Sequence, residues 1–288
     1  MRVWKPCSVT ATVAASCLVI VGAPATARAA DVPVATIEAQ QGTLVRWSVP
    51  GTKRCGMAGR SWAALQETCY YPVDMLRAPG LVRVSRQGVG PARFAHISVV
   101  ASSYGTQDIQ LGDIPQANPS AADLRRNARD QALVAKAWAR RESPARFTLP
   151  LGRPTTNLPK GEGFGAKWVF NTKPESSEIH SGADYALAPG TPVIALADGT
   201  VAIAEDLFFA GKAVFVDHGN GLIGMYFHMS ELKVQAGQDV KKGETLGLVG
   251  STGRVTGPHL HLGVRWHDAR IDPQTLLDDP AKIPSFVN

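Results

Sequence analysis

Two short motifs in this sequence contain side chains that could bind a metal ion or move protons. His259 and His261 lie two residues apart near the C-terminus, and the apolar residues 262–266 continue an extended pattern that predicts a β-strand. Side chains two positions apart on a strand share a face, so the two imidazoles should point the same way. His180 and Asp184, roughly eighty positions upstream, also share a face whether their segment is helical or extended. This combination favours a metal site or a proton-transfer pair.

A catalytic zinc ion commonly has three protein ligands and one position open to water. His180, Asp184 and one histidine of the C-terminal pair would complete such a set, and the spacing leaves open which of the pair binds. The other histidine would then lie within reach of the water as a general acid or base. His228 is a further candidate, because it should share a strand face with Tyr226 and could stabilise the oxyanion of a tetrahedral intermediate.

The segment that must position these motifs, residues 146–288, is predicted to form a compact, mainly antiparallel β-domain. Short apolar runs separated by Gly and Pro predict its strands, and Asn220-Gly221 is a strong signal for a hairpin turn. A second hairpin is predicted over residues 234–249, with its turn at 241–244. The expected strands before it are 191–196, 200–203, 213–216 and 222–228.

The preceding part of the chain is also mainly β, but it contains no recognisable chemistry. Residues 30–115 are predicted to form a small, immunoglobulin-like β-sandwich with strands at 43–49, 80–85 and 94–100. Ser120, followed by Asp123 three residues later, predicts a helix start. This helix, within a linker of residues 116–145, is expected to bridge the two domains.

Residues 1–29 have the composition of a secretory signal peptide. A basic start and an apolar run precede Ala27-Arg28-Ala29, which offers a cleavage site. Cleavage would leave 27 basic and 24 acidic residues and lower the net charge from +6 to +3. A mildly basic protein suits an anionic polymer such as the cell wall, whereas nothing here indicates nucleic-acid binding. No later stretch is long enough to cross a membrane, so no stable membrane insertion is expected after cleavage.

Cleavage would also remove two of the four cysteines and leave Cys55 and Cys69. Two cysteines in an exported chain favour a disulfide, here one that closes a short loop. A metal site built on them would lack nearby partner ligands.

Three separated motifs resemble those of the lysostaphin-like (LytM-type) zinc metallopeptidases, which cut peptide bonds in bacterial peptidoglycan. The resemblance covers about residues 147–273, and the flanking segments 188–193 and 250–253 also look like the family. Met229 stands where a leucine is common in the family, which is a conservative difference. The motifs are His180-x-x-x-Asp184, Tyr226-x-His228 and His259-x-His261.

The resemblance implies a role for each of five residues. One zinc ion (Zn2+) per chain would be held by His180, Asp184 and His261. His228 and His259 would be the catalytic histidines beside it. Some relatives have lost metal ligands and act as activators of cell-wall amidases, whereas this sequence retains all five polar positions.

Two other residues are weaker candidates for the site, and three further histidines are predicted to lie outside it. Asparagine in the corresponding part of some relatives contacts metal or substrate, so Asn171 is a candidate for the substrate groove, as is Tyr226 beside His228. His218 is predicted to be a turn or supporting residue, and His267 to be exposed to solvent. His96, on a strand of the first domain, is predicted to be structural.

The sequence therefore predicts an exported zinc endopeptidase of two domains that acts on the peptide portion of peptidoglycan, in the periplasm or after secretion. The resemblance makes the D-alanine to meso-diaminopimelate cross-link the expected bond. Two alternatives stay open: a non-catalytic, cell-wall-binding regulator of amidases, and a secreted bacteriolytic protease acting on glycine-rich peptides. The N-terminal domain or the linker helix could also occlude the groove and make the enzyme latent.

Overall fold

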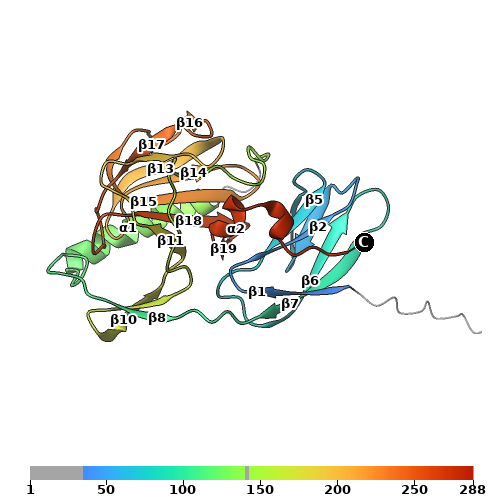
Figure 1. The fold of residues 1–288 in the computed structure, drawn as a ribbon, viewed down its shortest axis with the longest axis horizontal. Helices are drawn as coiled ribbons and strands as arrows, with labels where there is room; N and C mark the ends of the chain where they lie inside the picture. The colour runs from blue at the N-terminus through green and yellow to red at the C-terminus, as the bar shows by residue number, and fades with distance from the viewer. Residues whose placement is uncertain (1–34, 140–142, 288) are drawn as a thin grey trace, which may run out of the picture. The chain divides into compact units, whose positions relative to one another are not determined.

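The computed structural model describes residues 35–139 and 143–287, and these are the basis of all that follows (Figure 1). The predicted signal segment, residues 1–29, lies outside them. The described chain is mainly β, as the sequence predicts, with one long helix. None of the helices in these two ranges combines the length and the apolar character that a membrane span requires.

The first β-region consists of two sheets that share one apolar core. Alternating residues such as Val45 and Tyr71 from the smaller sheet meet Val82 and Ile97 from the larger one, which is the arrangement of a sandwich. The larger sheet has the order β1-β7-β6-β3-β4, with β1 and β7 parallel; the smaller pairs β2 with β5. These strands are β1 (Thr36–Gln40), β2 (Leu44–Ser48), β3 (Arg54–Met57), β4 (Arg60–Ala63), β5 (Thr68–Pro72), β6 (Gly80–Gln87) and β7 (Arg93–Val100).

The predicted disulfide between Cys55 and Cys69 is present. Cys55 lies on β3 and Cys69 on β5, so the bond joins the two sheets and does not merely close a loop. Both residues are buried in the sandwich core.

A small sheet of three strands connects the sandwich with the C-terminal region. Its order is β10-β9-β8, with β8 parallel to β9 and β9 antiparallel to β10. The strands are β8 (Thr106–Ile109), β9 (Lys167–Phe170) and β10 (Lys173–Ile179). Residues 106–109 were expected to belong to the first domain, but they pair with a strand sixty positions later.

The main C-terminal sheet is antiparallel and has the order β11-β18-β15-β14-β13-β16. In addition, β17 pairs with β12 and β15, and β19 pairs with β18. The strands are β11 (Gly182–Tyr185), β12 (Pro192–Ile194), β13 (Gly199–Leu207), β14 (Gly211–Asp217), β15 (Leu222–Leu232), β16 (Asp239–Val240), β17 (Thr245–Val249), β18 (Leu260–Trp266) and β19 (Ala269–Ile271). The hairpin at Asn220-Gly221 joins β14 to β15 as predicted.

The second predicted hairpin, over residues 234–249, does not form. Its two strands are β16 and β17, but β16 pairs with β13, whereas β17 pairs with β12 and β15. The turn residues therefore carry the chain from one part of the sheet to another.

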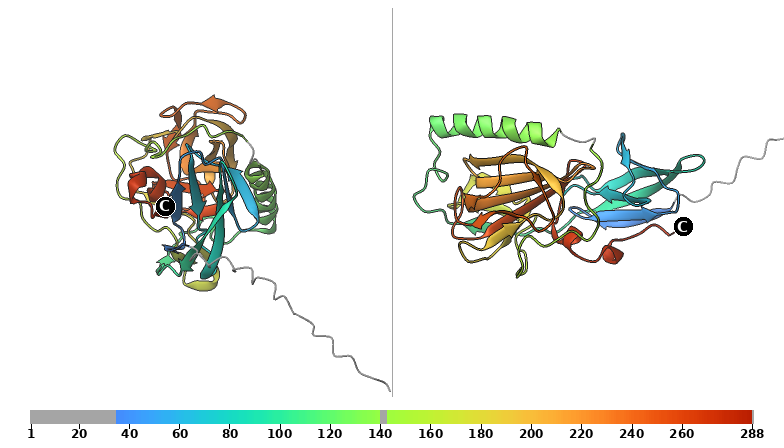
Figure 2. Two further views of the ribbon diagram at one scale, coloured as in Figure 1. Left: turned by 90° about the vertical axis from the view of Figure 1, so that its right-hand side faces the viewer. Right: turned by 90° about the horizontal axis from the view of Figure 1, so that it is seen from above.

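Helix α1 (Ala121–Trp138) begins where the sequence predicts. The Ser120 side chain accepts a hydrogen bond from the Asp123 backbone N–H, and the Asp123 carboxylate accepts one from the Ser120 backbone N–H. The helix was expected to be a bridge between domains, but it packs along the main sheet (Figure 2). Val134 and Ala137 are buried there in a cluster with apolar residues of β13, β14 and β15: Ile203, Leu207, Ala213, Phe215, Ile223 and Met225.

The C-terminal segment ends on the first sandwich and not on the main sheet. After α2 (Gln274–Leu277) and the short 3-10 helix η1 (Pro280–Lys282), Ser285 pairs with Arg46. The ring of Phe286 lies 5.0 Å from that of Trp47 and 6.5 Å from that of Tyr71, within the sandwich core. The span of 146–288 expected for the second domain thus includes residues that complete the core of the first.

Removing the disulfide should destabilise the protein without unfolding it. A link across 14 residues restricts the unfolded chain enough to contribute about 3 kcal/mol to the free energy of unfolding. We expect a Cys55→Ala, Cys69→Ala double variant to lose stability of this order, measured by urea unfolding. Reduced wild-type protein is the matched control and should show a similar loss; an unchanged urea midpoint in both would contradict the prediction.

Candidate active site

Three potential metal-binding atoms converge at one edge of the main sheet. Asp184 on β11 stands directly opposite His261 on β18 in the antiparallel register, and His180 lies between β10 and β11. His180 Nε2 is 3.1 Å from Asp184 Oδ1 and 2.9 Å from His261 Nδ1, and His261 Nδ1 is 2.9 Å from Asp184 Oδ1. His180 and Asp184 thus meet as predicted, but across a turn and not along one face of a single element.

This triangle fits a zinc ion. Ligand atoms around a tetrahedral zinc with bonds of about 2.0–2.1 Å lie about 3.3 Å apart, close to the distances found here. Burial by itself would raise the pKa of Asp184, but hydrogen bonds from His180 and His261 outweigh it and hold that pKa well below its usual value. Asp184 is therefore an anion, the form in which a carboxylate binds a metal.

Aromatic packing holds the two histidines of the triangle in place. The indole of Trp168 stacks on His180 at 3.9 Å, and the ring of Phe227 lies parallel to His261 at 5.0 Å. A Cβ on Gly182 would come within 2.5 Å of His261 Nε2, so a glycine is required where β11 passes this ring. These contacts restrict the rings to the orientation in which their nitrogens meet.

His259 and His228 lie beside the triangle with matching hydrogen bonds. His259 Nδ1 is 2.8 Å from the carbonyl of Gly257, and His228 Nδ1 is 2.9 Å from the carbonyl of Thr252. A carbonyl only accepts hydrogen bonds, so each Nδ1 carries the proton and each Nε2 has its lone pair free. The two rings are 4.9 Å apart, and His259 Nε2 is 3.7 Å from Asp184 Oδ1.

His228 reaches the site because β15 contains a β-bulge. Between Tyr226 and Met229, β15 has two residues where β14 has one, and His228 has a positive φ of 67°. Its backbone N–H donates to the carbonyl of Ala210 at 3.0 Å. The bulge turns His228 to the face that Phe227 occupies.

Tyr226 consequently does not share a face with His228, and the sequence prediction is wrong on this point. Tyr226 is completely buried in the main core, and its hydroxyl accepts a hydrogen bond from the Leu196 N–H at 3.1 Å. Burial raises the pKa of this phenol well above its usual value. The structure therefore gives Tyr226 a core position and not one in a substrate groove.

Asn171 is not brought into the site either. It lies in the turn between β9 and β10 with a positive φ of 49°, and its side-chain oxygen accepts a hydrogen bond from the Leu111 N–H at 2.7 Å. Asparagine tolerates this left-handed conformation better than most residues, which gives it a structural role here.

The three remaining histidines lie away from the triangle. His96 is half-buried on β7, and His218 is fully buried with its Nδ1 2.9 Å from the carbonyl of Asp198. His267 was expected to face solvent, but it is half-buried and stacks on Trp62 at 4.2 Å. Its ring thus helps to join the first sandwich to the turn between β18 and β19.

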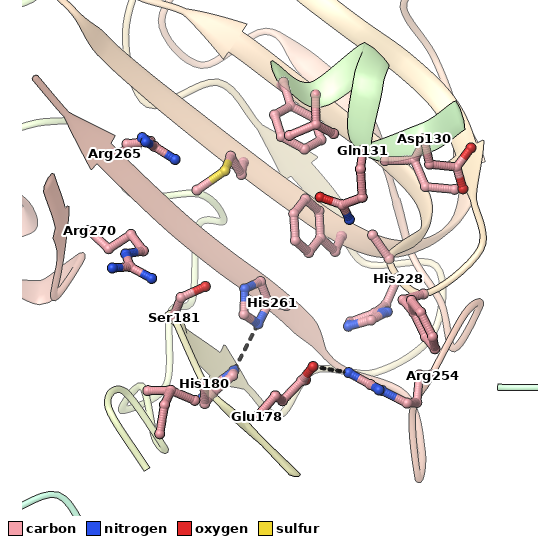
Figure 3. A pocket seen from close by; sticks show the side chains of 18 of the residues that line it. Asp130, Gln131, Glu178, His180, Ser181, His228, Arg254, His261, Arg265 and Arg270 are labelled. Atoms are coloured by element: carbon pink, nitrogen blue, oxygen red, sulfur yellow. Dashed lines mark hydrogen bonds and ion pairs between the residues drawn. The ribbon is translucent and has the colours of Figure 1, made fainter. Parts of the chain in front are cut away.

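A cavity of about 530 Å³ opens beside the site, with His180, His228 and His261 in its wall (Figure 3). Arg254 and Glu178 form an ion pair there, which the sequence analysis missed. The guanidinium of Arg254 lies between the rings of Phe170 and Phe209, at 4.1 and 4.5 Å. A charged residue directly after the Gly250–Gly253 loop was the available signal for Arg254, but nothing near Glu178 in the sequence indicated its partner.

Comparison with known proteins confirms the resemblance that the motifs suggest. Residues 178–273 match peptidase family M23 and include all five of the polar motif residues. Over 82 residues, the chain is 46% identical to the peptidoglycan DD-endopeptidase ShyA of Vibrio cholerae serotype O1. These 82 residues are 28% of this chain and 19% of that protein. Over 95 residues, it is 44% identical to the DD-carboxypeptidase/endopeptidase Mpg of Neisseria meningitidis serogroup B. This match spans 33% of this chain and 22% of the relative. The chain thus matches about one fifth of the length of these relatives.

One solved structure resembles most of the chain. It is a crystal structure assigned to peptidase M23 from Pseudomonas aeruginosa, with a TM-score of 0.63 and 28% sequence identity. The similarity covers 82% of this chain and 94% of that one. Residues 146–288 make up only about half of the chain, so a similarity over 82% of it must also include residues of the first β-region.

Metal binding should depend on Asp184 but not on His259. Asp184→Asn keeps the shape of the side chain and removes its charge. Loss of a residue that only hydrogen-bonds to a metal ligand lowers metal affinity by up to about 100-fold, so we expect loss of the Asp184 carboxylate to lower zinc affinity by more than this. His259→Gln is the matched control, because His259 lies outside the triangle, and it should retain one zinc per chain. The measurement is metal content by mass spectrometry after dialysis against low zinc; equal zinc content in both variants would refute the assignment.

Burial of His218 should make stability depend on pH. Burial, and secondarily the charge of Arg146, lower the pKa of His218 from 6.5 to about 4, despite the carbonyl of Asp198. Between these values the unfolded chain binds a proton that the folded chain does not, so stability falls as the pH drops from 6.5 to 4. At about 1.4 kcal/mol per pH unit, the free energy of unfolding falls by about 3 kcal/mol over this range.

His218→Gln, which can still donate a hydrogen bond to Asp198, should lose this part of the pH dependence. The free energy of unfolding is measured with urea at pH 7, 5.5 and 4.5. The quantity compared between the variant and the wild-type protein is its slope against pH, not its absolute value. A variant with the same slope as the wild-type protein would show that His218 is not responsible.

Proposed function

We propose that this chain, which carries a domain of peptidase family M23 at residues 178–273, is a zinc endopeptidase that hydrolyses peptide bonds in bacterial peptidoglycan. The observation that carries the proposal is the convergence of three potential ligand atoms next to two histidines whose Nδ1 atoms are hydrogen-bonded to backbone carbonyls. The name of the Vibrio relative, a peptidoglycan DD-endopeptidase, supports the substrate class, and the name of the Neisseria relative supports an endopeptidase activity.

His180, Asp184 and His261 are the residues that would hold the zinc ion. Two neutral imidazoles and one carboxylate leave a net positive charge on such a centre. Bound there, the ion would polarise the substrate carbonyl and acidify a water molecule.

His228 and His259 manage protons beside the metal. Because each Nδ1–H is committed to a backbone carbonyl, the Nε2 of each ring can accept a proton, and once protonated it can donate a hydrogen bond to a developing oxyanion. Burial, with the positive charges that His261 and His259 can carry, lowers the pKa of His228 to about 3, so this ring is neutral in the resting protein and its Nε2 is unprotonated. His259 is the more accessible of the two rings, which suits proton exchange with a water molecule.

The bond proposed to be cleaved is the D-alanine to meso-diaminopimelate cross-link. The DD-endopeptidase name of the Vibrio relative supports this assignment. We further propose that the protein works in the periplasm or after secretion. The disulfide supports this location, since such bonds persist in oxidising compartments.

Purified diaminopimelate peptidoglycan provides the test. The zinc-loaded protein of residues 30–288 should cleave the cross-links and so convert peptide dimers into monomers. Mass spectrometry identifies these products. Chelation of the metal, His228→Ala and His259→Ala should each reduce turnover by at least about 100-fold, the loss expected when a general acid or base is removed. His96→Ala, on β7 and away from the site, is the matched control and should remain active.

An intact substrate in the presence of zinc-loaded wild-type protein would contradict the proposal and favour a binding module or an amidase regulator. Cleavage of pentaglycine peptides but not of diaminopimelate peptidoglycan would retain the enzyme and change its substrate.

A further inference from the structure

The cavity beside the metal triangle has two walls that come from distant parts of the sequence. One is the face of the main sheet that bears Met225, Phe227 and His261. The other is helix α1, which contributes Asn127, Gln131 and Trp138. Figure 3 shows Gln131 on this helix, across the cavity from His261. The M23 match begins at residue 178, so α1 lies outside it.

We propose that α1 is the second wall of the substrate groove and that Gln131, assisted by Asn127, positions the bound peptide by hydrogen bonds to its backbone. This inference rests on the proposed function and names part of the surface that recognises the substrate. It assigns α1 a role in binding and not in blocking the site.

Contacts along the helix hold it in place. Near its start, Arg126 donates a hydrogen bond to the carbonyl of Asp206, and Asp130 accepts one from the Phe208 N–H, both at 2.7 Å. Val134 and Ala137 are buried against the sheet. A helix anchored at several successive turns is a fixed wall and not a plug that a substrate displaces.

The last turn of α1 is fixed from the opposite wall. The guanidinium of Arg265 on β18 lies 4.0 Å from the ring of Trp138. This cation–π contact connects the helix with the strand that also bears His261. The two walls are therefore joined at the end of the cavity where Trp138 lies.

Between these anchors the helix leaves open space. The cavity of about 530 Å³ falls within the roughly 300–1,000 Å³ typical of ligand pockets. The opening lies beside Asn127 and Gln131, because Val134 and Ala137 further along the helix are buried against the sheet.

The chemistry of the helix face suits a peptide backbone. Asn127 and Gln131 are four positions apart and so lie on one face, and Val134 continues it. The two amides each provide donors and an acceptor without charge, which matches the alternating N–H and C=O groups of a peptide. Neither amide makes a side-chain hydrogen bond within the described part of the chain, and Figure 3 shows Gln131 extending from α1 toward the cavity.

The test uses soluble cross-linked peptide dimers released from diaminopimelate peptidoglycan and the zinc-loaded chain of residues 30–288. Gln131→Ala should raise KM about tenfold while kcat stays within twofold, and Asn127→Ala should have a smaller effect in the same direction. Arg129→Ala, an exposed position on another face of α1, is the matched control and should leave both constants unchanged. Zinc content and melting temperature should equal those of the wild-type protein in all three variants.

Three outcomes would overturn the inference. An unchanged KM in Gln131→Ala would make α1 a scaffold for the sheet, and increased activity would make it an obstruction. A lower kcat with an unchanged KM would place Gln131 in the chemical step.

Failure of the proposed function is separable from failure of this inference. If the wild-type protein cleaves nothing, calorimetric titration with the same peptide dimers measures binding alone. Weaker binding by Gln131→Ala than by Arg129→Ala would then support the groove assignment without catalysis, and equal affinities would refute it.

Discussion

The pairing of β11 with β18 is the constraint on which the site depends. Its register sets Asp184 opposite His261, and the turn before β11 brings His180 to the same point. A buried carboxylate is costly unless it has partners, so the two histidines and the carboxylate stabilise their common position. Because β18 also pairs with β15, the strand that bears His228 lies next to the strand that bears His261. A slip of this register by one residue would move His261 to the opposite face of the sheet.

The main sheet has two apolar faces, and the way they are covered explains the position of the groove. One face forms the principal core with Tyr226 and Leu262. The other would be exposed without α1, which covers it with Val134 and Ala137. The helix does not cover the whole face, and the open part is next to the histidines. A linker that was expected to connect domains thus also shapes the site.

The first sandwich and the C-terminal region are connected by specific contacts as well as by chain. Asp74 accepts two hydrogen bonds from the Arg270 side chain, at 2.8 and 3.0 Å, and Tyr70 packs against Trp266 at 5.4 Å. Trp266 ends β18, the strand that bears His261. Phe286 returns to complete the sandwich core. The strand that bears His261 is therefore supported by contacts with the first sandwich.

The sequence by itself determined the features that depend on local contacts or on side-chain chemistry. The start of α1 follows from Ser120 and Asp123, three residues apart. The histidines and Asp184 predicted a metal site because few other residue types bind zinc, and the resemblance of their motifs to those of zinc metallopeptidases implied hydrolysis. The tertiary structure decided the rest, since it depends on residues far apart in the chain. The bulge that turns His228 away from Tyr226 is fixed by the carbonyls of Ala210 and Thr252, and a period of two along a strand cannot reveal an inserted residue. Likewise, no local pattern shows that Gln131 lines the same cavity as His228 and His261, because its place is set by the packing of α1 on a sheet formed seventy residues later.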